Sequence, residues 1–142
     1  MDWDWLTLDG VDWLAVVLAT LAAFAVGATW YAKALFGAAW MKIVGITEDQ
    51  AKNAVGMPLN YSLTMLTAFV SALVLNIAMV WVAIADPIEG AVFGALVGLV
   101  FRLGGHVIHN GFAGRGHKLT LIDGGHDVVS LAAAGAIIGA FL

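Results

Sequence analysis

Residues 53–85, NAVGMPLNYSLTMLTAFVSALVLNIAMVWVAIA, decide the fold because they contain no Asp, Glu, Lys or Arg. A helix needs about 20 mostly apolar residues to cross the hydrocarbon core of a bilayer, and this stretch supplies them. Its most apolar part predicts a transmembrane helix over residues 59–84. The sequence therefore indicates an integral membrane protein.

The composition of the whole chain supports the same class. Of its 142 residues, 62% are hydrophobic and only 11% are charged, with a mean hydropathy of +0.95. Soluble domains are usually about a quarter charged. The length predicts a single transmembrane domain over residues 1–142. The absence of Cys excludes disulfides and Cys nucleophiles, and a net charge of −4 with six Lys and Arg makes nucleic acid a poor partner.

Three further segments are long and apolar enough to span a bilayer. The prediction is therefore an all-α bundle of four transmembrane helices, over residues of about 11–32, 59–84, 87–109 and 119–142. The acidic start of the chain lacks the positive region of a cleavable signal peptide, so the first span should be retained.

A short amphipathic segment, residues 34–46 (ALFGAAWMKIVGI), lies between the first two spans. Its apolar side chains can share one helix face, which is typical of a helix on the membrane surface. Thr47 and Gln50 have the spacing of a capping box and predict a further helical turn.

The basic residues outside the spans predict the orientation. All of them lie between spans one and two or between spans three and four: Lys33, Lys42, Lys52, Arg115 and Lys118. The start of the chain and the turn after span two are acidic instead, with Asp2, Asp4, Asp9, Asp12, Asp86 and Glu89. By the positive-inside rule, we expect both chain ends to lie outside, in a bacterial inner membrane.

Aromatic residues near the ends of the spans are expected to anchor the helices at headgroup depth. These interfacial anchors are Trp13, Trp30, Tyr31, Trp40 and Trp81, with Trp3, Trp5 and Tyr61 in similar places.

Small residues recur every fourth position and predict close helix packing. The rows are Ala15, Ala19, Ala23 and Gly27 in span one, Gly90, Gly94 and Gly98 in span three, and Gly135 and Gly139 in span four.

Six ionisable residues within the last two spans form the candidate site: Arg102, His106, His109, Asp123, His126 and Asp127. Counted at ~1.5 Å per residue, Arg102 and Asp127 both lie roughly 22 Å from the outer surface. His106 and Asp123 both lie near 28 Å. The depths predict two cross-helix pairs, Arg102 with Asp127 and His106 with Asp123.

Several roles are open for this group. It could be a structural clamp between two helices, or a proton, ion or small-solute site, since intramembrane charges often line such pathways. His106, His109 and His126 are weak metal candidates, but the Arg102 charge opposes a cation. An intramembrane His could also be an axial ligand to haem or chlorophyll, although the sequence requires no cofactor. No nucleophile-and-base arrangement is present, so an enzyme is not expected.

The run GATWYAKALFGAAWMKIVGITEDQ resembles small bacterial membrane proteins of the domain of unknown function 1761 family. The matching residues are Gly27, Trp30, Tyr31, Leu35, Phe36, Gly37, Ala39, Trp40, Gly45, Thr47 and Glu48. The closing LIDGGHDVVSLAAAGAIIGAF is similar too, through Leu121, Ile122, Asp123, Gly125, Gly135 and Gly139. The family tends to have Tyr where this chain has His126. The resemblance implies a four-span protein and brings no activity.

Function is predicted at the level of class. We expect a non-enzymatic membrane component that forms a homo-oligomer or serves as an accessory subunit of a larger membrane complex. The alternative is a small ion- or proton-coupled transporter or channel that uses the polar cluster.

Overall fold

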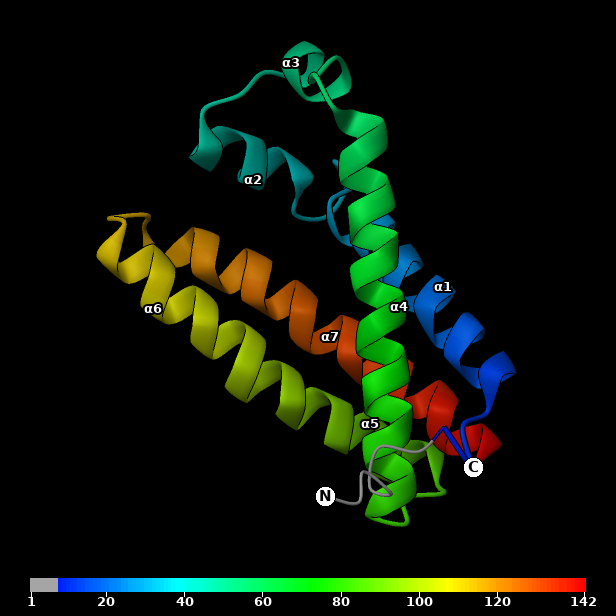
Figure 1. Cartoon of the computed structure of the whole chain (residues 1–142). Helices are drawn as coiled ribbons and strands as arrows, with labels where there is room; N and C mark the ends of the chain where they lie inside the picture. The colour runs from blue at the N-terminus through cyan, green and yellow to red at the C-terminus, as the bar shows by residue number, and fades with distance from the viewer. Residues whose placement is uncertain (1–7) are drawn as a thin grey trace, which may run out of the picture.

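In the computed structural model, residues 8–142 are described, and they fold into helices joined by short turns, with no strand among them (Figure 1). Four helical spans are long and apolar enough to cross a membrane, so the all-α, four-span prediction is confirmed. The predicted roles of Asp2, Trp3, Asp4 and Trp5 lie outside the described residues. The elements are α1 (Trp13–Trp30), α2 (Gly37–Val44), α3 (Glu48–Lys52), α4 (Met57–Trp81), α5 (Pro87–Val97), the π-helical segment η1 (Gly98–Leu103), α6 (Gly104–Phe112) and α7 (His117–Phe141).

Local capping and turn chemistry place the helix ends a few residues from the predicted bounds. The Asp12 carboxylate accepts a hydrogen bond from Ala15 N at 2.8 Å and so begins α1. Asp86 caps α5 in the same way, and both caps satisfy amides that have no partner within the helix. α4 begins early after Gly56, which has φ +81°, and ends early before Ala83, which has φ +57°. The third span continues to Phe112 through α5, η1 and α6.

Between the first two spans, α2 and α3 form the short segment expected at the membrane surface, and their placement is compatible with that position (Figure 1). The predicted capping box is present: Gln50 N donates to Thr47 Oγ1 at 3.2 Å, and Thr47 N donates to Gln50 Oε1 at 2.8 Å. Lys33, just after α1, and Lys52 both pair with Glu48. These contacts fix α3 beside the end of α1.

The two ends of the bundle carry opposite charges. Because successive spans run antiparallel, the turn near Lys33 and Lys52 and the α6–α7 turn near Arg115 lie at one end, called here the basic end (Figure 1). Asp12 and Asp86 lie at the other, the acidic end.

Close packing is concentrated between α5 and α7. A methyl group on any of five glycines would overlap or crowd main-chain atoms of the facing helix or its cap: Gly90, Gly94, Gly98, Gly135 and Gly139. Small residues therefore let these two backbones touch, and dispersion forces then act over the whole contact.

The apolar core occupies the half of the bundle nearer the acidic end. It consists of Ala15, Val16 and Ala19 of α1, Ala72, Leu75 and Met79 of α4, and Ala134 and Ile138 of α7. In contrast, residues 57–71 of α4 include no buried residue. The basic half of α4 is therefore much less covered than the acidic half.

Candidate functional site

Asp127 of α7 is the centre of a hydrogen-bonded cluster between α7 and the third span. Its Oδ2 atom lies 3.4 Å from Arg102 Nε and 3.1 Å from His106 Nε2. Its Oδ1 atom lies 3.0 Å from His126 Nδ1, and His126 Nε2 lies 3.2 Å from Ser130 Oγ. One carboxylate therefore connects a cation and two imidazoles, and the chain of contacts continues to a hydroxyl group.

The structure confirms one of the two predicted pairs and corrects the other. Arg102 pairs with Asp127 as predicted, but His106 also contacts Asp127 and not Asp123. Asp123 instead accepts a hydrogen bond from the Tyr31 hydroxyl at 2.9 Å. The wider turn of η1, which precedes His106, moves this side chain from the position that a regular α-helical rise predicts. The end of α1 packs against α7 and supplies the partner for Asp123.

His126 sits in a pocket formed by the end of α1. A Cβ atom on Gly27 would lie only 3.1 Å from His126 Nε2, so the glycine leaves room for the imidazole. The centroid of the Tyr31 ring lies 5.3 Å from that of His126, and the Trp30 ring packs edge-on at 6.4 Å. The Trp30 indole also donates to the Ile122 carbonyl at 3.0 Å. Trp30 and Tyr31, which were predicted as lipid anchors, thus hold α1 against the site.

The other predicted anchors lie in different surroundings. Trp13 and Trp81 are exposed near the acidic end, where their anchoring role remains a prediction. Trp40 of α2 is half-buried and packs edge-on against Tyr31, with ring centroids 5.8 Å apart.

His109 is exposed and shares no hydrogen bond with the cluster. Between residues 8 and 142, no group of three His, Asp or Glu side chains comes together in a way that could hold a metal ion. Of the weak metal candidates, only His106 and His126 meet, and they do so through opposite oxygens of the same carboxylate.

A cavity of about 1630 Å³ lies beside the cluster, between α1, α4, α7 and the α2–α3 segment. One wall is formed by the cluster itself, through Arg102, His126, Asp127 and Ser130. The facing wall on α4 carries Asn60, Thr64, Thr67 and Ser71. Lys33, Glu48 and Lys52 lie at the basic end. Three of the six candidate residues, Arg102, His126 and Asp127, therefore face an open space as well as each other.

The polar wall of α4 is the part of the site that the ionisable residues alone do not predict. Its residues are spaced i, i+4, i+7 and i+11, so they lie on one helix face. This polar periodicity lies within the charge-free stretch 53–85 and is the signal in the sequence that indicates the wall. The hydroxyl groups of Thr64 and Thr67 donate to the main-chain carbonyls of Asn60 and Leu63, both at 2.8 Å. Their oxygen lone pairs remain available to accept hydrogen bonds from the cavity.

The family model described as "Protein of unknown function (DUF1761)" matches residues 14–139. The chain belongs to this family. The match includes nearly all of the four spans and every residue of the cluster and the cavity, and it confirms the resemblance seen in the sequence. No curated protein and no solved structure matches the chain. Membership in the DUF1761 family brings no activity with it.

Proposed function

We propose that this DUF1761 protein is a small carrier that binds a solute in the cavity and couples its movement to protons through Asp127. One observation supports this proposal: the Asp127 cluster forms part of the cavity wall. Small-molecule pockets are commonly about 300–1,000 Å³, and this cavity is larger. An ion pair that only joins two helices requires no cavity next to it, whereas intramembrane charges on a pathway do.

The hydrogen-bonded chain supplies a route for the proton. It runs from His106 through Asp127 and His126 to Ser130 on the cavity wall. An imidazole can accept a proton at one nitrogen and release one from the other, and its ordinary pKa is near neutral. Protons could therefore pass from His106 on α6 to Ser130 on the cavity wall along these side chains, without a water molecule between each pair of groups.

The Arg102–Asp127 pair supplies a way to couple the proton to the solute. While Asp127 is ionised, it holds the guanidinium group at 3.4 Å. Protonation of Asp127 removes that attraction and frees Arg102, which lines the cavity, to bind an acceptor group on a solute. A proton and a solute would then favour the same conformation of the cluster.

Cysteine accessibility tests whether the cavity holds water. The natural chain has no Cys, so single substitutions give no background reaction. In liposomes, Thr67→Cys and Ser130→Cys should react with a membrane-impermeant methanethiosulfonate reagent. Val70→Cys, exposed one turn along α4 but outside the cavity, is the matched control. If Thr67→Cys is as unreactive as Val70→Cys, the cavity is not a hydrated site and the proposal fails.

Proton movement is the second test. In liposomes loaded with a pH-sensitive dye, a potassium diffusion potential should drive proton uptake through the wild-type protein. Asp127→Asn should lower the rate about tenfold, because it removes the shared acceptor of the chain. His109→Gln, on the same helix as His106 but outside the cluster, should keep the wild-type rate. Equal rates in wild type and Asp127→Asn would remove proton coupling from the proposal.

The orientation and location of the carrier are part of the proposal. The excess of Lys and Arg at the basic end supports placing that end in the cytoplasm of a bacterial inner membrane, with both termini outside. The same Cys variants test this orientation. An impermeant reagent added on the cytoplasmic side should react with them through the opening at the basic end, whereas reagent added on the outer side should not.

Self-association, or an accessory role in a larger membrane complex, is the second candidate function. Its support is on α6, where Gly105 and Gly111 have nothing within 4 Å of the position of a Cβ atom. Such open small-residue positions suit close approach by another helix. The mass of the detergent-solubilised protein by light scattering tests it, and a monomer with no co-purifying partner would contradict it.

A further inference from the structure

We infer that the solute is an amphiphile with one hydrocarbon chain and an anionic head, and that it enters the cavity from the bilayer between α1 and α4. This inference rests on the proposed carrier function, because it names the substrate class and the entrance of the same cavity. Three observations support it: an apolar groove on the outside, an aromatic pair that separates the groove from the cavity, and the charge of the cavity.

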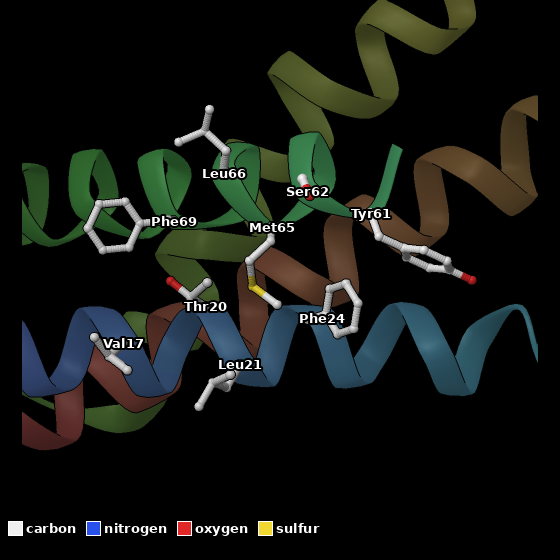
Figure 2. A pocket seen from close by; sticks show the side chains of 9 residues that line it. All are labelled: Val17, Thr20, Leu21, Phe24, Tyr61, Ser62, Met65, Leu66 and Phe69. Atoms are coloured by element: carbon white, nitrogen blue, oxygen red, sulfur yellow. The ribbon is translucent and has the colours of Figure 1, made fainter. Parts of the chain in front are cut away.

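An apolar groove follows the outside of the α1–α4 contact (Figure 2). Its volume is about 690 Å³, and it is lined by Val17, Thr20, Leu21, Phe24, Tyr61, Ser62, Met65, Leu66 and Phe69. The Met65 side chain reaches from α4 towards α1 and lies between Thr20 and Phe24, which both come from α1 (Figure 2). The only hydroxyl group that α1 contributes is satisfied, because Thr20 Oγ1 donates to the Val16 carbonyl at 2.7 Å. The groove therefore suits a hydrocarbon chain.

Phe24 and Tyr61 belong to both spaces, since they line the groove and also line the cavity that contains the charged residues. Their rings meet edge-on, with centroids 6.3 Å apart, and form the partition between the two. No hydrogen bond joins this pair, and an aromatic contact of this kind contributes only about 0.5–1.5 kcal/mol beyond its buried area. A rotation of either side chain would connect the groove with the cavity at low cost. An amphiphile could then keep its chain in the groove while its head occupies the polar side.

The charges in the cavity favour an anionic head. Three cationic side chains line it (Lys33, Lys52 and Arg102), but only two carboxylates do (Glu48 and Asp127). Both lysines pair with the same Glu48, so the basic end of the cavity keeps a net positive charge. A carboxylate or phosphate would neutralise it and gain charge-assisted hydrogen bonds. The groove that reaches the partition has a volume of about 690 Å³, which is enough for one hydrocarbon chain, so we assign the occupant one such chain.

Binding of a fluorescent fatty acid tests the inference in the full-length protein. The probe is dansyl-undecanoic acid, with its methyl ester as the uncharged control, in nanodiscs of zwitterionic phosphatidylcholine. Met65→Trp fills the groove and should weaken binding of the acid about tenfold. Val70→Trp adds the same side chain to α4 outside both spaces and should leave affinity within about twofold of wild type. Equal affinities for the two Trp variants would overturn entry through the groove.

The charge requirement is tested separately at the basic end. Lys33→Gln should weaken binding of the acid but not of the ester. Added salt should reduce the difference in acid affinity between the wild type and this variant. Lys42→Gln, on α2 and outside the cavity lining, is the matched control. Wild-type protein that binds the ester as tightly as the acid would overturn the anionic head.

A two-chain lipid is distinguished by competition. Palmitate should displace the probe, whereas replacing the nanodisc lipid with phosphatidylglycerol should not. Displacement by phosphatidylglycerol at least as strong as by palmitate would overturn the single-chain assignment. Failure of these binding tests while Thr67→Cys remains reactive would refute the inference alone. An unreactive Thr67→Cys would refute the carrier function on which it rests.

Discussion

The acidic and basic halves of this bundle are built differently, and α4 shows the contrast within one helix. Its second half places Ala72, Leu75 and Met79 in the apolar core, whereas residues 57–71 include no buried residue. In the acidic half, glycines bring backbones into contact. In the basic half, α4 lines the cavity together with α1, α7 and the α2–α3 segment, and polar side chains form part of its wall. The packing that stabilises the fold thus lies in the acidic half, and the groups that can bind a ligand lie in the basic half. The tightly packed half can therefore support a site whose side chains are free to adjust.

The sharpest test of this contrast adds one methyl group at the close α5–α7 contact and one at a glycine with open space around it. Gly94→Ala should lower the free energy of unfolding by about 3 kcal/mol, because its Cβ atom would overlap the Leu131 carbonyl and main-chain atoms cannot move aside. Gly105→Ala, with open space around it, should change it by less than about 1 kcal/mol, towards higher stability. Unfolding in mixed micelles titrated with dodecyl sulfate measures both. Equal effects would mean that close α5–α7 packing does not stabilise the fold.

A buried amide in the acidic half gives the next largest effect. Asn76 is fully buried, and neither its Nδ2 nor its Oδ1 atom has a hydrogen-bond partner. Asn76→Leu should therefore raise the free energy of unfolding by about 1–2 kcal/mol, because it removes two unpaired polar atoms from an apolar region. Asn110→Leu is the contrasting variant, since Asn110 Nδ2 donates to Thr120 Oγ1 at 3.2 Å, and it should destabilise. A loss of stability in Asn76→Leu would show that water or a ligand satisfies the amide.

The contrast between the halves also explains what the sequence could predict. Hydropathy and charge identify the four spans, because a helix that crosses the bilayer needs about 20 mostly apolar residues in a row. Such a stretch is a long, local signal in the sequence. The Arg102–Asp127 pair was also predictable, since it joins neighbouring helices at similar depth. The role of Tyr31 was not, because its partner Asp123 lies 92 residues away, and an aromatic residue near a span end fits an anchor equally well. The cavity depends on the divergence of helices, which no local pattern records.

Tyr31 tests whether the contacts between α1 and α7 stabilise the basic half. Tyr31→Phe removes the hydrogen bond to Asp123 but keeps the ring beside His126, so stability should fall by about 1 kcal/mol. Tyr61→Phe is the control, because Tyr61 is exposed, and it should change stability by less than about 0.5 kcal/mol. Thermal unfolding in detergent, followed by circular dichroism, compares them. If Tyr31→Phe unfolds at the wild-type temperature, the basic half does not depend on this contact.

The smallest expected effect lies at the surface of the basic half, where Lys33 and Lys52 pair with Glu48. The hydrogen bond from Lys33, followed by that from Lys52, lowers the pKa of Glu48 from 4.5 to about 2. Because the folded-state pKa is lowered, the contribution of the pair is complete above about pH 4.5 and is lost as the pH falls towards 2. A bimane dye on Asp49→Cys should report release of α3 with a midpoint near 2. Lys33→Gln should move this midpoint upwards towards 4.5, and Glu48→Gln should abolish it.

Since these groups are exposed, high salt should shift the midpoint in the same direction as Lys33→Gln. A midpoint that neither salt nor Lys33→Gln changes would show that α3 is held by apolar contacts, as in the acidic half, and not by charge.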